Sequence, residues 1–411
     1  MTKAGTTKDP GITRIGVVGC GYVADLYAQT LSAHPELVVQ GLYDLNPERL
    51  AAHASCHNRL RYDSLDYMLA DPAVELVVNL TNPEAHHAVS HAALLAGKHV
   101  YSEKPLGVDL SEAKALMALA EEKGLLLGSA PCNHLAEATE ALAELIRNQA
   151  LGSVCSVHAQ MDDGMLPGLD FEHWRSISGA PWPYEDEFRM GVTLEHAGYS
   201  LVPLVYLFGP VRKVIAYAAN RVPDKGARLG VDPAVTRDDM SWAILEFDRG
   251  VVARLTTSVL APIDRSIRII GTEAVATLAD VWDYRTQVRI APTGKTKRHK
   301  VFRKIDKLVG QWVPGFMSGG RVTLPEPRFG VRSQGGRRAK RPKGGNAMDF
   351  ARGPAALAAA IRGEAENPLP ADLGLHITEV TLVLREPESH PIPYVVESSP
   401  AALPGSPWRP I

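Results

Sequence analysis

Three side chains that can carry a proton lie within five positions of one stretch, GVTLEHAGY at residues 191–199. They are Glu195, His196 and Tyr199. In a helix, Glu195 and Tyr199 stand at i and i+4 on one face, and His196 and Tyr199 stand at i and i+3. The stretch therefore raises the question whether one of these side chains moves a proton. It does not say by itself which of the three side chains does so.

A lysine adds a fourth candidate group. Lys104 follows the stretch KHVYSE, which is expected to be a buried strand, and it precedes Pro105. Proline disfavours a helical conformation in the residue before it, so the chain at Lys104 is expected to be extended. We expect the ammonium group to point from a rigid strand end into a cleft, and the alternative is an ordinary surface lysine.

A glycine turn predicts a dinucleotide site. Gly19, Gly21 and Ala24 form GxGxxA between an apolar strand and a helix. The first glycine allows a tight turn, the second lets the backbone approach a pyrophosphate, and the small third residue lets helix and strand pack closely. Asp44 ends the next strand, where a carboxylate binds ribose hydroxyls and repels a 2′-phosphate. The sequence thus favours NAD, and Arg49 keeps NADP open as the alternative.

The order of the expected elements divides the chain into two units. Between residues 12 and 151, apolar strands alternate with helices, which is typical of an α/β domain with a doubly wound parallel sheet. From 152 to 390, strands follow one another closely, which predicts an α+β domain with an open, mostly antiparallel sheet. Residues 391–411 are expected to form a C-terminal tail. Helices of the second unit are expected at 194–208, 347–363 and 371–386.

Composition limits the class of protein. The chain has 411 residues, of which 45% are hydrophobic and 22% charged, as is usual for a globular protein. Its four cysteines show no metal-type spacing, so we expect reduced thiols and a cytoplasmic location. The first residues lack the apolar core of a secretory leader, and no apolar run reaches the roughly 18 residues that a membrane span needs. Membrane insertion is therefore not expected.

Residues 295–343 form a basic insertion in the second unit, with 15 Lys and Arg and only two acids. Three readings stay open: a solvated or disordered insertion, an arm that wraps a neighbouring subunit, or a surface that attracts an anionic ligand. The interspersed Trp312, Phe316 and Phe329 favour docking. No nucleic-acid-binding motif accompanies the insertion, so nucleic acid is not an expected partner.

Further stretches carry a resemblance to a known family. AGKHVYSEKPLG at 96–107 contains a Glu-Lys-Pro signature, EHAGYSLVPLVYLFGP at 195–210 ends in Gly-Pro, and NLTNPEAHHAV at 79–89 carries His86. With the glycine turn, they resemble the Gfo/Idh/MocA oxidoreductases, the relatives of glucose–fructose oxidoreductase and inositol dehydrogenase. The resemblance leaves out the basic insertion, which has no counterpart in the family pattern.

The resemblance implies a Rossmann domain, a second domain with an open sheet, and an active site in the cleft between them. It implies hydride transfer between the nicotinamide and a carbinol or keto carbon of a sugar, cyclitol or related polyol. It also implies a homo-oligomer, a dimer or a tetramer. Two alternatives stay open. One is a bound NAD that is recycled within each turnover, in an epimerase, eliminase or glycoside-cleaving enzyme. The other is a non-catalytic ligand sensor.

The resemblance also assigns roles at the proton site. Lys104 stands at the family's catalytic lysine. Many relatives place Asp and His where this chain has Glu195 and Tyr199, and some branches use a tyrosine, so Tyr199 is the expected acid/base and Glu195 an orienting group. Because an ammonium group favours a phenolate, we expect Lys104 to lower the pKa of Tyr199. His196 is the rival, since an imidazole titrates near neutrality, but it stands one position off the register.

Two larger sets complete the expected site. The motif positions imply these cofactor-binding residues: Gly19, Gly21, Tyr22, Val23, Asp44, Thr81, Asn82, His86, Glu103 and Lys104. The polar and aromatic segment 161–188 is expected to line the sugar pocket, and a surface loop is the alternative. Its substrate-binding candidates are Asp163, His173, Trp174, Arg175, Trp182 and Tyr184. The spacing of its histidine and carboxylates fits no standard zinc pattern, so no metal is expected.

Overall fold

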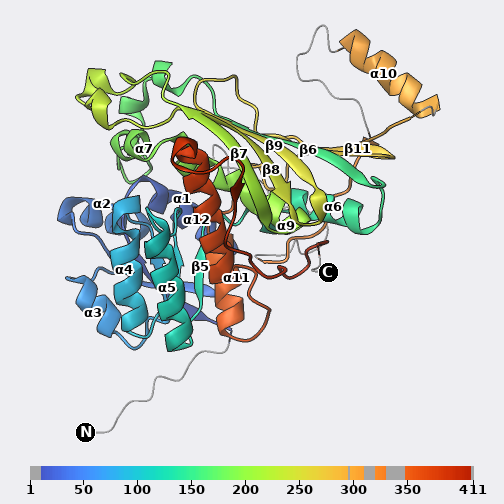
Figure 1. Cartoon of the computed structure of the whole chain (residues 1–411). Coiled ribbons are helices and arrows are strands. Elements are labelled where there is room, and N and C mark those ends of the chain that lie inside the picture. The colour runs from blue at the N-terminus through green and yellow to red at the C-terminus, as the bar shows by residue number, and fades with distance from the viewer. Residues whose placement is uncertain (1–10, 295–296, 310–319, 330–347, 409–411) are drawn as a thin grey trace.

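The computed structural model describes residues 11–294, 297–309, 320–329 and 348–408. In these residues the chain forms two sheets, of five and nine strands, that lie next to each other (Figure 1). The N-terminal residues make the first sheet and its helices. The second sheet forms the upper body in this view. The fold is thus an α/β Rossmann domain joined to an α+β domain, as the sequence predicted.

The first sheet is parallel throughout, with the strand order β2-β1-β3-β4-β5. Its strands are β1 Thr13–Val18, β2 Leu37–Tyr43, β3 Leu76–Asn79, β4 His99–Ser102 and β5 Leu127–Ser129. The helices between and after them are α1 Tyr22–Thr30, α2 Pro47–His57, α3 Leu65–Ala70, α4 Pro83–Leu95, α5 Leu110–Lys123 and α6 Glu137–Arg147. After β2 the chain crosses to the other side of β1, so the strand order reverses between β1 and β3. Sheets of this kind bind ligands at such a switch point, at the carboxyl ends of the strands.

Burial on both faces explains why these strands are apolar without alternation. All four residues of β3 are buried. Val78 packs in a core with Ala24 and Tyr27 of α1, whereas its neighbour Val77 packs in a separate core with Leu94 of α4. Successive side chains of a strand point to opposite faces, so a strand covered by helices on both sides has no polar face.

The second sheet has the strand order β13-β12-β11-β10-β6-β9-β8-β7-β14. Its strands are β6 Val154–Asp162, β7 Val211–Ala219, β8 Met240–Phe247, β9 Val252–Ser258, β10 Ile267–Gly271, β11 Ala274–Leu278, β12 Val288–Pro292, β13 Gly320–Arg321 and β14 Tyr394–Val395. All neighbours are antiparallel except β6 and β9, which run parallel. The mostly antiparallel character was predicted. The last two elements β13 and β14 are too short to give a sequence signal.

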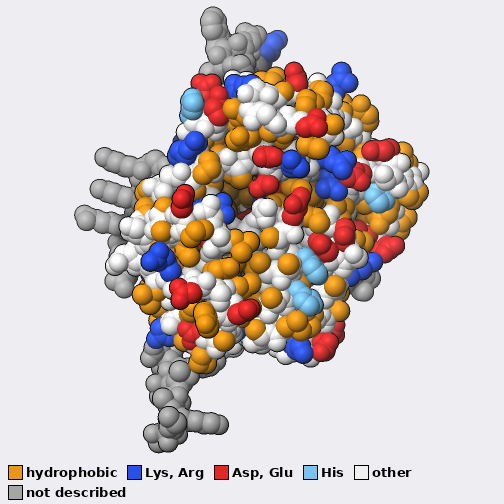
Figure 2. All heavy atoms as spheres, turned by 90° about the vertical axis from the view of Figure 1, so that its left-hand side faces the viewer, with side chains coloured by type: hydrophobic (Ala, Val, Ile, Leu, Met, Phe, Trp, Pro, Cys, Tyr) orange, Lys and Arg blue, Asp and Glu red, His pale blue; other side chains and the backbone are white. Residues whose placement is uncertain are grey.

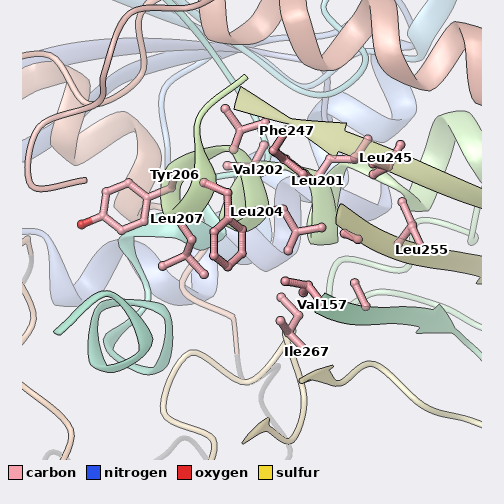
Figure 3. Packing of buried hydrophobic residues seen from close by; sticks show 14 of the residues in the cluster. Val157, Leu201, Val202, Leu204, Tyr206, Leu207, Leu245, Phe247, Leu255 and Ile267 are labelled. Atoms are coloured by element: carbon pink, nitrogen blue, oxygen red, sulfur yellow. The ribbon is translucent and has the colours of Figure 1, made fainter. Parts of the chain in front are cut away.

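The helices of the second domain are α7 Tyr184–Met190, α8 Val192–His196, α9 Gly198–Phe208, α10 Lys297–Val309, α11 Arg352–Ile361 and α12 Ala371–Arg385. The expected helix at 194–208 is divided at Ala197 into α8 and α9. Apolar residues surround α9 on nearly all sides, because it lies between the sheet and other helices. Figure 3 shows Leu201 and Leu204 of α9 beside Leu245 and Leu255 of the sheet. No helix among the described residues is long and apolar enough to span a bilayer.

The chain passes between the two domains more often than the predicted boundary at residue 151 implies. Helix α6, placed in the first unit by sequence, contacts β11 and β12, and its Leu142 is part of the second core. Helix α11, placed in the second unit, contacts β2, β4 and β5 and buries Leu357 in a core of the first sheet. Helix α12 contacts both α5 and β7, and β14 then pairs with β7. The tail predicted from residue 391 therefore begins with a strand of the second sheet.

Part of the basic insertion is helical. Helix α10 stands away from both sheets, at the upper right of Figure 1. Its Val301, Ile305 and Leu308 are exposed, and their spacing puts them on one side of the helix. Of the aromatic residues predicted to dock, Phe329 packs against a core of the first sheet. Trp312 and Phe316 lie outside the described residues.

A buried histidine, His34, connects the first domain to the segment at Asp349, which follows the basic insertion. His34 is fully buried, its Nε2 lies 2.9 Å from Asp349 Oδ2, and its Nδ1 lies 3.3 Å from Glu36 Oε1. Burial disfavours the charged imidazolium, but the two carboxylates outweigh burial and raise the pKa of His34 to about 9. His34 is therefore a cation at neutral pH, and its charge contributes to the stability of this contact.

The stability conferred by His34 is expected to depend on pH. Because its pKa is higher in the folded chain than the ordinary ~6.5, this contribution is complete below pH ~6.5 and is lost as the pH rises through about 9. We expect His34→Ala to lower the free energy of unfolding by up to about 3 kcal/mol more at pH 6 than at pH 10. Urea unfolding at both pH values measures this difference. An equal loss of unfolding free energy at the two pH values would contradict a charged His34. His91→Ala, on the surface of α4, is the control.

Candidate active site

The glycine turn at the end of β1 has the geometry that a dinucleotide needs. Gly19 has φ +95°, and a Cβ on it would lie 2.5 Å from the backbone oxygen of Leu80, so only glycine fits. Gly21 caps α1 in an extended conformation, and a Cβ on it would meet nothing within 4 Å. The space above Gly21 is thus open to a ligand, and the free amides of α1 point to it. Ala24 is buried, as the pattern predicts.

Asp44, at the end of β2, is fixed from four directions. Its Oδ2 accepts hydrogen bonds from the Cys20 amide at 2.7 Å and from Arg49 Nε at 2.9 Å. Its Oδ1 accepts from the Asn46 amide at 2.7 Å and from Arg49 Nη2 at 2.8 Å. Burial alone would raise the pKa of Asp44, but the bonds from Arg49 and the backbone lower it. A carboxylate is therefore present where ribose hydroxyls are expected, and the same site holds the arginine that could accept a 2′-phosphate.

Lys104 and Glu195 form an ion pair across the two domains. Lys104 follows β4, the Lys104–Pro105 peptide is cis, and Nζ donates to Glu195 Oε2 of α8. Burial disfavours the ammonium group, but Glu195 and the neighbouring Tyr199, Glu187 and Glu103 outweigh it and raise the pKa of Lys104. Burial and the nearby Glu187 raise the pKa of Glu195, against the effect of Lys104. Lys104 is thus a cation that faces helix α8, as the sequence predicted.

Tyr199 lies beside this pair, but its acidity differs from the prediction. The Lys104 ammonium nitrogen lies 6.0 Å from the centre of the Tyr199 ring. Burial raises the pKa of Tyr199, and the carboxylates of Glu103, Glu195 and Glu187 add to this, so the lowering by Lys104 is outweighed. The expectation that Lys104 lowers the pKa of Tyr199 overall is therefore wrong. It counted one cation and not the three acids around the phenol.

His196 is buried and points to a different partner from Tyr199. Its Nε2 lies 2.9 Å from Glu187 Oε1 of α7, and its Nδ1 has no hydrogen-bond partner in the described part of the chain. Burial disfavours the imidazolium, but Glu187 and Asp163 outweigh burial and raise the pKa of His196. The same contact lowers the pKa of Glu187, which burial alone would raise. These carboxylates thus favour the imidazolium form of His196, whose ring centre lies 6.5 Å from that of Tyr199.

An arginine and a tryptophan close this part of the site. Arg265 Nη1 donates to Asp163 Oδ1 at 2.6 Å, and Nε and Nη2 bind Asp280 at 3.1 and 2.9 Å. The guanidinium stacks on Trp282 at 4.4 Å from its ring centre. Trp282 in turn contacts the rings of His196 and Tyr199. The sequence predicted Asp163, and it placed Glu187 in the expected pocket segment 161–188 without singling it out. It gave no sign of Arg265 or Trp282, because these two residues reach the site only through the fold.

The remaining cofactor candidates surround the turn in different ways. Thr81 is partly buried and binds Asn79, whereas Asn82 is exposed before α4. Glu103 is buried and accepts a hydrogen bond of 2.7 Å from the Tyr27 hydroxyl. His86 is buried with Nδ1 2.7 Å from Pro105 O and Nε2 3.0 Å from Thr81 O. His86 thus braces the two loops that follow β3 and β4. Tyr22 and Val23 are partly exposed in the first turn of α1.

Three of the six predicted substrate residues lie in a separate apolar cluster. Trp174, Trp182 and Tyr184 pack around Phe171 and Phe188, which are buried. His173 and Arg175 are exposed in the same segment. Asp163 is the member of the predicted set that is found with His196 and Arg265. A role of the other five in substrate binding stays a prediction.

A pocket lies where the two domains meet. It is lined by Lys104 and Pro105 from the first domain, by Glu195 and Tyr199, and by apolar residues of α12 such as Leu373. Figure 2 shows the side of the molecule that carries α2, α4 and α7, with side chains of both charges gathered in a band across its middle. The arrangement places a cation, a phenol and the carboxylate of Glu195 in one pocket, and these groups can move a proton.

Two family profiles match adjacent parts of the chain. The Gfo/Idh/MocA "oxidoreductase family, NAD-binding Rossmann fold" matches residues 13–130. The Gfo/Idh/MocA C-terminal domain matches residues 139–277. The two matches cover both bodies of the structure and include the glycine turn, Lys104, Glu195 and Tyr199.

Curated relatives are similar over most of the chain or over its first domain. Trans-1,2-dihydrobenzene-1,2-diol dehydrogenase from Mus musculus is 26% identical over 274 residues, 66% of this chain and 75% of the relative. UDP-N-acetylglucosamine 3-dehydrogenase from Acidithiobacillus ferrooxidans is 38% identical over 115 residues, 28% of this chain and 35% of the relative.

A solved structure shares the fold. The WlbA dehydrogenase from Bordetella pertussis, in complex with NADH and UDP-GlcNAcA, has a TM-score of 0.63 and 19% identity. The likeness covers 92% of this chain and 95% of that one. At this identity the likeness concerns the fold.

The pairing of His196 with Glu187 can be tested without a substrate. Replacing the carboxylate by an amide in Glu187→Gln removes the main group that favours the imidazolium, so we expect the pKa of His196 to fall. An NMR titration of the histidine ring protons measures it. Glu185→Gln is the matched control, because Glu185 is an exposed acid of the same helix that pairs with Arg189. An unchanged pKa in Glu187→Gln would show that the pair does not form in solution.

Proposed function

Since the chain belongs to the Gfo/Idh/MocA oxidoreductase family, we propose that it transfers a hydride between NAD and a carbinol or keto carbon of a sugar, cyclitol or related polyol. The observation that carries this proposal is the meeting of Lys104, Glu195 and Tyr199 at the domain seam. Lys104 follows β4 and the glycine turn follows β1. Both are carboxyl ends of one parallel sheet, where a dinucleotide and its substrate bind.

The substrate class rests on the relatives and on the charges of the site. The relatives named above are dehydrogenases of a cyclic diol and of a sugar nucleotide, and both substrates carry neighbouring oxygens on a ring. The seam of this chain offers donors in Lys104 and His196 and acceptors in Glu195 and Asp163. Such a mixture suits a molecule with several hydroxyl groups, each of which both donates and accepts.

Tyr199 and Lys104 handle the hydroxyl proton in this proposal. When bound, the nicotinamide supplies or accepts the hydride. Tyr199 gives its phenolic proton to the substrate oxygen in reduction and takes it back in oxidation. Lys104 stabilises negative charge on that oxygen or on the phenolate, and Glu195 holds the ammonium in place. Because the pKa of Tyr199 is raised, the phenol is neutral at neutral pH and ready to donate, and oxidation should become faster as the pH rises.

His196 is the second candidate for the acid/base. Its free Nδ1 supports it, since a buried donor or acceptor without a partner is suited to a ligand. Its ion pair with Glu187 argues against it, because that pair keeps the imidazole charged and turned to α7. With His196 as the acid/base, the rate of oxidation would stop rising near neutral pH, whereas with Tyr199 it would continue to rise.

The choice of NAD over NADP follows from Asp44. A carboxylate at the ribose repels a 2′-phosphate, and the amides of Cys20 and Asn46 hold it in place. Arg49 Nε and Nη2 both donate to Asp44, so two of its donors are turned towards the carboxylate and away from a phosphate. The residues of the turn fit the cofactor, since Gly21 leaves its approach open.

We also propose that the chain forms a homo-oligomer through its second sheet. Ile215 and Tyr217 of β7 are exposed, and they stand opposite Ile244 and Trp242 of β8 in register. These neighbours form a contiguous apolar patch, which is typical of a protein interface. Light scattering of the purified chain measures the number of subunits, and Trp242→Lys should lower it.

Loss of the proton site should abolish turnover. We expect Lys104→Ala and Tyr199→Phe each to lower kcat by about 10²–10⁴-fold. NADH affinity should change little in Tyr199→Phe, because Tyr199 is not among the expected cofactor-binding residues, whereas Lys104→Ala is expected to weaken NADH binding as well. Fluorescence titration with NADH and assays with a panel of polyols measure the two quantities. Lys114→Ala and Tyr67→Phe are matched controls on the surface of the first domain.

The same assays separate the alternatives. If His196→Gln loses turnover and Tyr199→Phe keeps it, His196 is the acid/base. If cofactor changes redox state once and never leaves the protein, it is recycled within each turnover. If no polyol changes a bound cofactor, the sensor reading takes the place of the enzyme.

Cofactor preference should depend on the charge at residue 44. Asp44→Ser removes the acceptor of ribose hydroxyls and frees Arg49, so we expect weaker binding of NADH by about tenfold and tighter binding of NADPH. Titration of both dinucleotides against the wild type and the variant gives the ratio of the two affinities. A wild-type protein that binds NADPH more tightly would overturn the proposed preference.

A further inference from the structure

Two histidines of α2 face a carboxylate of α1, away from the proton site. His53 and His57 stand at i and i+4, so they lie on one side of their helix, with ring centres 4.5 Å apart. Asp25 Oδ1 lies 2.5 Å from His57 Nε2 and 3.6 Å from His53 Nε2. One ligand atom from each residue lies within 4.8 Å of the others. None of these three residues is among the expected cofactor-binding or substrate-binding residues.

The second oxygen of Asp25 is held by the other domain. Asp25 Oδ2 accepts hydrogen bonds from the hydroxyl of Ser176, from the hydroxyl of Ser178 at 2.6 Å and from the Ser178 amide at 3.1 Å. These donors fix the plane of the carboxylate and turn Oδ1 towards the two imidazoles. Outer bonds of this kind orient the ligands of metal ions in proteins.

His53 lacks the partners that a buried imidazole needs. It is 3% exposed, and neither ring nitrogen makes a hydrogen bond of ordinary geometry in the described structure. Burial lowers the pKa of His53, and Asp25 and a backbone contact with Ala24 act in the opposite direction. A buried polar atom without a partner costs about 1–3 kcal/mol, so an unpaired imidazole that faces a carboxylate points to a missing ligand.

The distances fit a tetrahedral metal ion after a small movement. Zinc binds His nitrogen and carboxylate oxygen at about 2.0–2.2 Å, which places two ligand atoms about 3.3 Å apart. The separation of Asp25 Oδ1 and His53 Nε2 is already 3.6 Å. The contact of His57 with Asp25 must lengthen from 2.5 Å by about 0.8 Å, a movement that a single side-chain rotation provides. His53 and His57 also line a cavity beside α1, which gives the rings room to move.

We propose that Asp25, His53 and His57 bind a divalent transition-metal ion, zinc in the first instance. Two imidazoles and a carboxylate are a donor set that zinc uses, and they leave one position for water. The absence of metal-type spacing in the sequence does not oppose this, because the carboxylate comes from a different helix. The ion would join α1 to α2 within the first domain, and Asp25 would keep its hydrogen bonds to Ser176 and Ser178 of the second domain.

Metal binding by the full-length chain tests the proposal. After removal of metal with a chelator, the wild type should take up about one Zn²⁺ per chain, and Co²⁺ should give the visible absorption bands of a tetrahedral site. His53→Gln should lose both. Ser178→Ala keeps all three ligands and should weaken binding by about 10–100-fold, because it removes one bond that orients Asp25. Zinc should also raise the melting temperature of the wild type and not that of His53→Gln.

A matched control separates this site from chance binding. His87 and His91 of α4 have the same i, i+4 spacing with rings 5.6 Å apart, but they are partly exposed. Among the described residues they form no group of three possible ligands with a carboxylate. His87→Gln should leave the tight binding unchanged. Uptake of less than about 0.1 Zn²⁺ per chain by the folded wild type would overturn the proposal. So would tight binding that survives His53→Gln and disappears in His87→Gln. Circular dichroism checks that each variant is folded.

Discussion

The structure depends on the pairing of charges that the two domains remove from water at their seam. Lys104 at the end of a strand of the first sheet meets Glu195 of the second domain, and His196 and Arg265 meet Glu187 and Asp163 close by. A buried charge without its partner costs several kcal/mol, so each of these groups constrains the position of another. The seam is thereby fixed in one arrangement, and the glycine turn, the lysine and the phenol are held at the same edge of the sheet.

Local patterns in the sequence predicted the parts of the fold that local chemistry determines. The glycine turn is one case, because Gly19 has a backbone conformation and a close neighbour that exclude any side chain. The strand of Lys104 and the helix of Glu195 and Tyr199 are others, since hydrophobic runs and proline act on their own segment. The resemblance to the family indicated in addition which of these residues should face the cleft.

The remaining parts of the site come from residues that are distant in sequence. Trp282 reaches Tyr199 from beyond β11, and Arg265 reaches Asp163 from the start of β10. No spacing rule links such positions. The direction of the pKa shift of Tyr199 was wrong for the same reason, because burial of the phenol and the carboxylates of Glu103 and Glu187 arise only in the folded chain. Aromatic residues before the helix were expected to line a pocket, yet composition alone does not distinguish a pocket wall from a small core such as that around Phe171.

The repeated crossing of the chain has a mechanical consequence. Helix α11 covers the first sheet, α12 contacts elements of both bodies, and β14 closes an edge of the second sheet. A hinge motion between two domains needs a flexible connection. Here the domains are joined by the connection that leads into β6, and in addition helix α12, of 15 residues, contacts both of them. Rotation of one body against the other would have to break the contacts of α12 with α5 or with β7. The path of the chain therefore opposes a simple hinge motion between the two domains.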